Sequence, residues 1–202
     1  MEQTIIKNAR FLTSVGLGGE YPPQRAIEVA IVGKSNVGKS SLINTICNNY
    51  KLAKTSQTPG KTRLINFFDI NNSFYLVDLP GYGFARAPRG EQQKWGELIG
   101  TYLGSGRVNH IFMLIDIRHS PTIEDKQMFG WILYYGVPFT LIATKADKIA
   151  VTKRKSAANK VAKELGAPPF AIPFSAEYRT GKDELLEKIG CIVSDSVSII
   201  DK

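Results

Sequence analysis

The chain has 202 residues, which suits one domain with a sizeable core, and we expect a single domain over residues 1–202. Hydrophobic residues make up 43% of the sequence and charged residues 22%, both ordinary for a soluble globular protein. The net charge of +8 is compatible with nucleic-acid binding, but a basic protein without such a partner would carry the same charge.

Membrane insertion and secretion are disfavoured by the sequence. It contains no run of about 18 apolar residues, so we expect no membrane span. The first residues carry an acid at Glu2 and no apolar signal core, which argues against secretion. Cys47 and Cys191 lack any metal-binding spacing and are most simply reduced, partly buried thiols. Together these features predict a cytoplasmic protein.

The first elements of the chain surround a glycine-containing loop. Residues 1–25 form an N-terminal extension, in which we expect Phe11, Leu12 and Val15 to cover one edge of a sheet. Residues 27–32 are β-branched and apolar and predict a buried strand, and residues 41–46 have apolar positions spaced for a helix face. The loop between them, residues 33–40, matches G-x-x-x-x-G-K-[ST] in full and is called the P-loop below.

The residue types of the P-loop predict phosphate binding. Gly33 and Gly38 permit backbone angles that let successive N–H groups face a phosphate, and the helix start adds unpaired N–H donors. Lys39 is expected to reach the β- and γ-phosphates and to act in catalysis, and the Ser40 hydroxyl to ligate Mg²⁺. The remaining residues expected to line the phosphates are Lys34, Ser35, Asn36 and Val37.

A polar loop and a hairpin follow. Residues 51–62 lack periodicity and contain a Pro-Gly pair, which predicts a long and functional loop. Residues 63–70 and 74–78 predict two strands, and the turn at Asn71 and Asn72 between them is so short that the strands must be antiparallel.

The hairpin ends in Asp78, Leu79, Pro80 and Gly81, which we assign to the nucleotide site. An acid at the carboxyl end of an apolar strand beside the P-loop is where a second magnesium anchor is needed, and we expect Asp78 to hold the ion through water. Gly81 is placed to offer its N–H to a γ-phosphate and so to sense that phosphate. An ordinary turn at a strand end would use the same residues.

The remaining elements alternate between helices and strands. We expect helices over residues 91–103, 122–135, 151–165 and 181–199, and strands over residues 111–116, 139–143 and 169–174. The total of six strands and about five helices predicts an α/β fold, a three-layer sandwich whose mostly parallel six-stranded sheet has one antiparallel strand. The helix over residues 151–165 is rich in Lys and Arg, which fits either a solvated face or an RNA-facing surface.

A base-reading segment is predicted after the strand over residues 139–143. It consists of Thr144, Lys145, Ala146 and Asp147. The Asp147 carboxylate would accept hydrogen bonds from N1–H and the N2 amino group of guanine, a donor pair that adenine lacks. The Lys145 stem would lie over the ring. The last strand leads into Phe174, Ser175 and Ala176, whose backbone N–H groups would touch the guanine edge.

The motifs together, in order and over nearly the whole chain, resemble those of the EngB (YsxC/YihA) family of bacterial ribosome-assembly GTPases, within the TRAFAC P-loop GTPases. The segments that carry the resemblance are residues 33–40, 59–62 with Asn66-Phe67 beyond, 78–85, Asp116 to Pro121, 144–147 and 174–176. Phe84 stands where the family often has Tyr.

The resemblance implies roles for further residues. Thr62 would be the switch threonine that ligates Mg²⁺ in the GTP state, as a third metal residue beside Ser40 and Asp78. The residues that would line the nucleotide in this loop are Gly60, Lys61, Thr62, Arg63 and Leu64. The family is linked to assembly of the large ribosomal subunit and to cell division and septation, which implies a ribosomal RNA partner. We expect a monomer.

Two hypotheses concern hydrolysis. Tyr82 stands where many GTPases place a water-orienting glutamine, and a phenol cannot orient water as an amide does, so intrinsic hydrolysis should be slow. Asn36 stands where potassium-using GTPases place an asparagine, so a K⁺ ion would neutralise charge between the phosphates. The alternative for Asn36 is an asparagine that only braces the loop.

Two other functions remain open at this stage. A P-loop kinase would need an acceptor pocket and a base, and the sequence offers no candidate for either; His110 and His119 are isolated. A membrane-associated division GTPase would be compatible with the basic helices, and flotation with anionic vesicles would distinguish it from a ribosomal protein.

Overall fold

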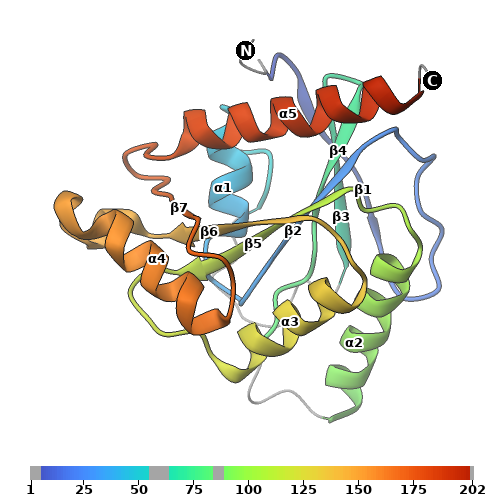
Figure 1. Ribbon diagram of the computed structural model, residues 1–202. Helices are drawn as coiled ribbons and strands as arrows, with labels where there is room; N and C mark the ends of the chain where they lie inside the picture. The colour runs from blue at the N-terminus through green and yellow to red at the C-terminus, as the bar shows by residue number, and fades with distance from the viewer. Residues whose placement is uncertain (1–5, 55–63, 84–88, 201–202) are drawn as a thin grey trace.

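The computed structural model describes residues 6–54, 64–83 and 89–200. They form a sheet with the strand order β1-β3-β4-β2-β5-β6-β7 (Figure 1). The strands are β1 (Ala9–Val15), β2 (Glu28–Gly33), β3 (Ile65–Ile70), β4 (Phe74–Asp78), β5 (His110–Asp116), β6 (Phe139–Thr144) and β7 (Ala171–Pro173). Both neighbours of β3 pair with it antiparallel and the other pairs are parallel, so β3 is the single antiparallel strand that was predicted.

The sheet has seven strands among the described residues, not the six expected. The additional strand is β1, which pairs with β3 at the sheet edge from Ala9–Ile70 to Val15–Ile65. This segment has no alternating pattern of apolar and polar residues, because most side chains of β1 are exposed, including Phe11 and Leu12. An edge strand that buries little lacks the period-two signal on which strand prediction depends.

Helices cover both faces of the sheet, as a three-layer sandwich requires (Figure 1). Side chains of α2 (Arg89–Gly104), α3 (Ile123–Tyr134) and α4 (Arg154–Leu165) pack in one core. Those of α1 (Lys39–Ile46) and α5 (Lys182–Ile200) pack in the other. No helix in the described ranges is long and apolar enough to cross a membrane.

The expected and observed bounds differ most for two elements. The helix predicted over residues 151–165 begins as a short 3-10 turn at Val151–Lys153, and the α-helix α4 starts only at Arg154. The strand predicted over residues 169–174 is shortened to Ala171–Pro173. Phe170 is 80% exposed and its N–H donates to Pro168 O, so a proline-driven turn replaces the first part of that strand.

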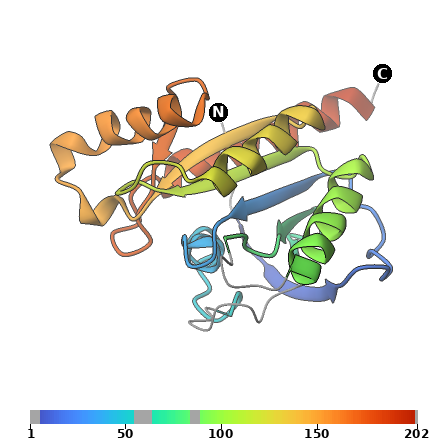
Figure 2. The ribbon, with the colours of Figure 1, turned by 90° about the horizontal axis from the view of Figure 1, so that it is seen from below.

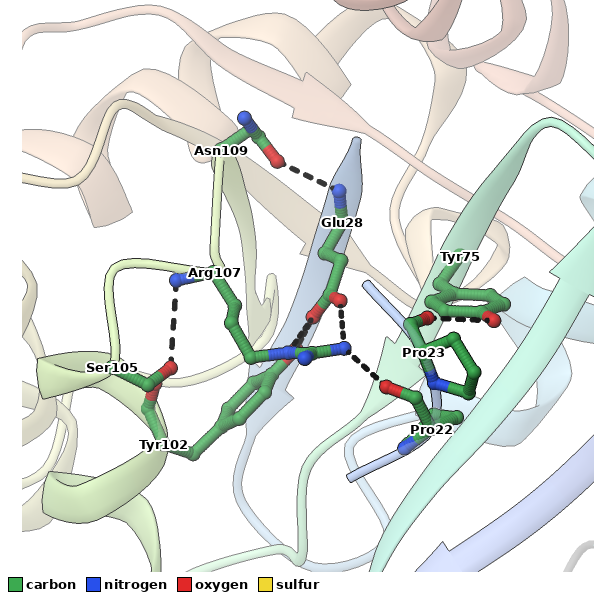
Figure 3. Close-up of polar contacts among 8 residues, drawn as sticks. All are labelled: Pro22, Pro23, Glu28, Tyr75, Tyr102, Ser105, Arg107 and Asn109. Atoms are coloured by element: carbon green, nitrogen blue, oxygen red, sulfur yellow. Dashed lines mark hydrogen bonds and ion pairs between the residues drawn. The ribbon is translucent and has the colours of Figure 1, made fainter. Parts of the chain in front are cut away.

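A buried polar cluster fixes the end of the sheet that lies away from the P-loop (Figure 3). Glu28, the first residue of β2, is fully buried, and its carboxylate accepts hydrogen bonds from Tyr102 Oη at 2.7 Å and Arg107 Nη2 at 2.5 Å. Arg107 also donates to Pro22 O, and Tyr75 Oη donates to Pro23 O. The cluster therefore ties the segment that leads into β2 to α2, to β4 and to the chain before β5.

Candidate functional site

The P-loop lies between β2 and α1, as its sequence context predicts (Figure 2). A Cβ atom on Gly33 would lie 2.9 Å from Leu114 O and 2.8 Å from Val37 Cγ1, so only glycine fits at the end of β2. Gly38 has φ +117° and caps the N-terminus of α1, a conformation that side-chain-bearing residues rarely adopt. Asn36, at φ +62°, is exposed. The N-terminal N–H groups of α1 are thereby left for an anion.

The Thr144 hydroxyl connects the P-loop to the neighbouring strands by hydrogen bonding. Its buried hydroxyl lies 2.8 Å from Val37 O and 3.2 Å from Ile115 O. The side chain of Thr144 thus acts on the backbone of the P-loop and of β5, and its position at the end of β6 brings the base-reading segment next to the phosphate site. The sequence motif placed Thr144 in the site but gave no indication of this contact.

Asp78 ends β4 beside Lys39, with 4.0 Å between Asp78 Oδ1 and Lys39 Nζ. Burial raises the pKa of Asp78, and the Lys39 ammonium and a hydrogen bond from the Asn66 side chain oppose that rise. Oδ1 is buried and has no hydrogen-bond partner among the described residues. A buried carboxylate oxygen that accepts no hydrogen bond is costly, and a magnesium ion or one of its waters would supply the missing partner. The residues present therefore fit Mg²⁺.

The chain that follows Asp78 lies directly on the P-loop. Ser35 N–H donates to Tyr82 O at 2.9 Å, and Lys34 and Tyr82 form an isolated parallel bridge. A Cβ atom on Gly81 would lie 2.8 Å from Ser35 Oγ and 3.0 Å from Lys39 Nζ. A side chain at position 81 would collide with Ser35 and Lys39. Glycine at this position therefore allows the backbone after Asp78 to lie close to the P-loop.

Tyr82 points away from the phosphates into the core. Its hydroxyl donates to Asp125 Oδ1 at 2.8 Å, and its ring packs edge-on against Trp95. Burial, together with the charge of Asp125, raises the pKa of Tyr82 far above its usual value, so the phenol stays protonated. Asp125 belongs to the capping box of α3 with Thr122. The chain after Asp78 is thus joined to the first turn of α3.

The predicted guanine-reading residues converge at the ends of β6 and β7. Asp147 Oδ1 accepts from Ser175 Oγ at 2.9 Å, and Oδ2 lies 2.9 Å from Lys148 Nζ. Burial opposes ionisation of Asp147, but the hydrogen bonds from Lys148 and Ser175 outweigh it and lower its pKa. The carboxylate is therefore charged and held in place. Ala146 N–H donates to Phe174 O, which joins the two loops.

Lys145 is held by an ion pair that the sequence motif did not assign. Its φ is +59°, and its Nζ lies 3.0 Å from Asp116 Oδ2. Arg118 binds both oxygens of Asp116. Burial alone would raise the pKa of Asp116, but Arg118 and Lys145 lower it well below the usual range. Asp116 thus fixes the stem of Lys145 beside the base-reading Asp147.

The other predicted site residues fall into three groups. Leu79, Ala146 and Phe174 are buried, so they can serve the site only through their backbone. Pro80 O accepts a hydrogen bond from Trp95 Nε1 at 3.0 Å. Leu64, directly before β3, is 41% exposed. The predicted residues that lie outside the described ranges are Gly60, Lys61, Thr62 and Arg63.

Comparison with known proteins identifies the family of this chain. A family described as "50S ribosome-binding GTPase" matches residues 28–145, which is more than half of the chain. A probable GTP-binding protein EngB of Desulforamulus reducens is 49% identical over 183 residues, covering 89% of each chain. The corresponding protein of Geobacter sulfurreducens is 42% identical and covers 96% of this chain and 95% of its own. This chain belongs to the EngB family.

Structures related to this EngB-family chain show the same fold. The crystal structure of a probable GTP-binding protein engB matches with a TM-score of 0.68 at 22% identity, over 83% of this chain and 99% of that one. Era in complex with MgGDPNP and nucleotides of 16S ribosomal RNA matches with a TM-score of 0.62 at 22% identity, over 82% of this chain and 56% of that one. The fold agrees with the family model and the EngB relatives, which make this chain a P-loop GTPase that hydrolyses GTP to GDP and phosphate.

Proposed function

We propose that the site binds GTP or GDP with Mg²⁺ through the residues predicted from the motifs. Lys39 and the N–H groups at the start of α1 bind the phosphates, while Ser40 and Asp78 hold the ion. Mg²⁺ supplies positive charge beside the β- and γ-phosphates. The buried Oδ1 of Asp78 lies beside Lys39 and has no hydrogen-bond partner among the described residues, which supports this assignment. Thr62 remains the proposed third metal residue.

We propose that Asp147 selects guanine. Its carboxylate is ionised and is oriented by Ser175, so it can accept two hydrogen bonds from N1–H and the N2 amino group. Adenine has no such donor pair and would leave the base-facing acceptor sites of the carboxylate desolvated without a donor. The Lys145 stem, fixed through Asp116, packs on the ring.

The observation that carries the proposed switch is the contact between Ser35 N–H and Tyr82 O. Because Gly81 and Tyr82 lie on the P-loop, the presence or absence of a γ-phosphate changes what this segment contacts. Tyr82 then transmits the difference to α3 through its hydrogen bond to Asp125. Because the Tyr82 hydroxyl is bound to Asp125, Tyr82 has no group that could orient the attacking water. We therefore propose that intrinsic GTP hydrolysis is slow.

The proposed role of the switch is in assembly of the large ribosomal subunit in the cytoplasm, in association with normal cell division. The description of the matching family as ribosome-binding supports a ribosomal partner, and the net charge of +8 suits RNA. We propose that one GTP-binding domain acts as a monomer. A kinase function is set aside, because the chain belongs to a family of GTPases.

Co-sedimentation with ribosomal subunits tests this function. The protein is spun with large and small subunits at two salt concentrations, with a non-hydrolysable GTP analogue, GDP or no nucleotide. The expected result is binding to the large subunit that is strongest with the GTP analogue and persists at the higher salt. Binding that ignores the nucleotide and disappears at the higher salt would show only unspecific attraction to RNA and would overturn the proposal.

A further inference from the structure

A row of polar side chains crosses three strands beside the proposed metal site. Asn66 on β3 lies opposite Asp78 on β4, and Ser14 on β1 lies opposite Asn66. Side chains of directly opposed residues in antiparallel strands lie on the same face, with Cβ atoms about 5 Å apart. The neighbours of these residues in sequence, Val15 and Val77, belong to the core on the other face of the sheet. The row therefore faces the side covered by α1, where Lys39 and Ser40 lie.

The hydrogen bonds along this row have only one consistent direction. Asn66 lies opposite Asp78 in the strand pair, and its hydrogen bond favours the charged form of the carboxylate, so Asn66 uses its amide N–H₂ as the donor towards Asp78. Its amide oxygen then remains as an acceptor, and the Ser14 hydroxyl donates to it at 2.7 Å. Ser14 thus fixes which end of the Asn66 amide faces Asp78.

The bond from Asn66 also decides which carboxylate oxygen is free. Asp78 Oδ1 has no hydrogen-bond partner in the described part of the chain, so Asn66 holds Oδ2. Oδ1 is the oxygen that lies 4.0 Å from Lys39 Nζ, on the side of the phosphates. With one oxygen held from the neighbouring strand, the other is presented to the nucleotide site without further rotation of the side chain.

We propose that Asn66 and Ser14 are positioning residues for magnesium binding, because they orient the Asp78 carboxylate from strands β3 and β1. The edge strand β1 thereby contributes to the metal site through Ser14. The inference depends on the proposed role of Asp78 as a magnesium anchor. Groups that orient metal ligands are a regular part of metal sites, and their removal weakens metal affinity about 10- to 100-fold. The edge strand β1, whose side chains are mostly exposed, therefore has a role in orienting a metal ligand that its sequence alone did not indicate.

The test is the magnesium dependence of nucleotide retention, which does not depend on hydrolysis. A fluorescent GDP is loaded on the full chain, and its dissociation rate is measured over a range of Mg²⁺ concentrations and in EDTA. Asn66→Ala is expected to raise the Mg²⁺ concentration for half-maximal retention about tenfold. Ser14→Ala, which acts through Asn66, is expected to raise it about threefold. The rates in EDTA should match those of the unchanged chain, because the phosphate and guanine contacts remain.

Two further variants separate positioning from strand stability. Ser14→Thr keeps the hydroxyl and should restore the original Mg²⁺ requirement. Thr13→Ala changes the neighbouring residue of β1, whose side chain points to the other face, and should leave the requirement unchanged. Thermal melting of each variant reports its folding.

The outcomes distinguish the inference from the function on which it rests. If the unchanged chain retains GDP equally with and without Mg²⁺, the proposed metal site is wrong and the inference fails with it. If the chain requires Mg²⁺ but Asn66→Ala stays within about twofold of it, the metal site stands and the positioning role is wrong. Equal Mg²⁺ requirements for Ser14→Ala and Ser14→Thr would also overturn the role of Ser14, even if Asn66→Ala does not fold.

Discussion

Replacing Arg107 by Met should destabilise the protein strongly, although Arg107 lies outside the nucleotide site. Met keeps much of the length of the side chain but removes the guanidinium that binds Glu28 (Figure 3). The Glu28 carboxylate is fully buried, and Tyr102 would be its only remaining side-chain donor among the residues shown to contact it. The variant also loses the hydrogen bond to Pro22 O and the stacking of Arg107 over Tyr21.

The expected magnitude follows from the burial of the carboxylate. Breaking a buried ion pair by removing one partner typically costs about 3–5 kcal/mol, because the other charge stays desolvated. For a domain of this length, about 1 kcal/mol corresponds to a shift of about 2–4 °C in melting temperature, so Arg107→Met should melt about 10 °C lower. Burial already raises the pKa of Glu28, and loss of Arg107 raises it further. At pH 5 the buried Glu28 of the variant is more readily protonated and no longer carries an unpaired charge. The loss in free energy of unfolding caused by Arg107→Met should therefore be smaller at pH 5 than at pH 7.

Urea unfolding at pH 7 and pH 5 measures this prediction, with Lys160→Met as the control. Lys160 pairs with Glu164 on the surface of α4, where an exposed pair contributes less than about 1 kcal/mol. Glu28→Gln in the Arg107→Met background should recover part of the loss, since it removes the unpaired charge. A loss below about 1 kcal/mol for Arg107→Met, with no recovery from Glu28→Gln, would refute the reasoning.

The remaining predictions concern the site and the pH dependence of stability. Tyr82→Phe should keep basal GTP hydrolysis in a phosphate-release assay but lower the melting temperature, because Asp125 loses its buried donor; abolished hydrolysis would give Tyr82 a direct role. Burial, with the charge of Lys188, lowers the pKa of His110 to about 4. The folded protein therefore loses stability as the pH falls from about 6.5 towards 4, and His110→Gln should reduce that loss in melting curves. Hydrolysis should be faster in KCl than in NaCl and lose that difference in Asn36→Ala, whereas equal rates in both salts would exclude the K⁺ hypothesis.

Much of the site could be predicted because its residues fall in a few short motifs, each of which can be recognised by itself. The P-loop carries its own signal, since Gly33 and Gly38 are needed where a Cβ atom would clash or where φ is positive. Asp78 and Asp147 each follow a strand that is apolar enough to be recognised, and parallel strands bring such ends to one edge of the sheet. The order of these motifs was therefore sufficient to predict the α/β fold, and the short turn at Asn71 and Asn72 was sufficient to predict its antiparallel strand.

The contacts that the sequence did not reveal join residues far apart in the chain. Glu28 and Arg107 are 79 positions apart, and Tyr82 and Asp125 are 43 apart. No local pattern marks such a pair, because each partner alone resembles a surface charge or a core aromatic residue. The strand β1 was missed for a different reason: its exposed side chains show no periodicity, and its pairing with β3 depends on the backbone.

Nucleotide selectivity of the Asp147→Asn variant tests the central claim, that this site is built to read guanine, most directly. Equilibrium binding of GDP and XDP is measured for the unchanged chain and the variant. The variant keeps one acceptor oxygen but loses the negative charge and turns the second oxygen into an N–H₂ donor, which should weaken GDP binding about 100-fold or more, while xanthine, with a carbonyl at C2, should bind better to the asparagine amide. A variant that binds GDP as tightly as the unchanged chain and still rejects XDP would contradict the assignment of Asp147 and the account of the site.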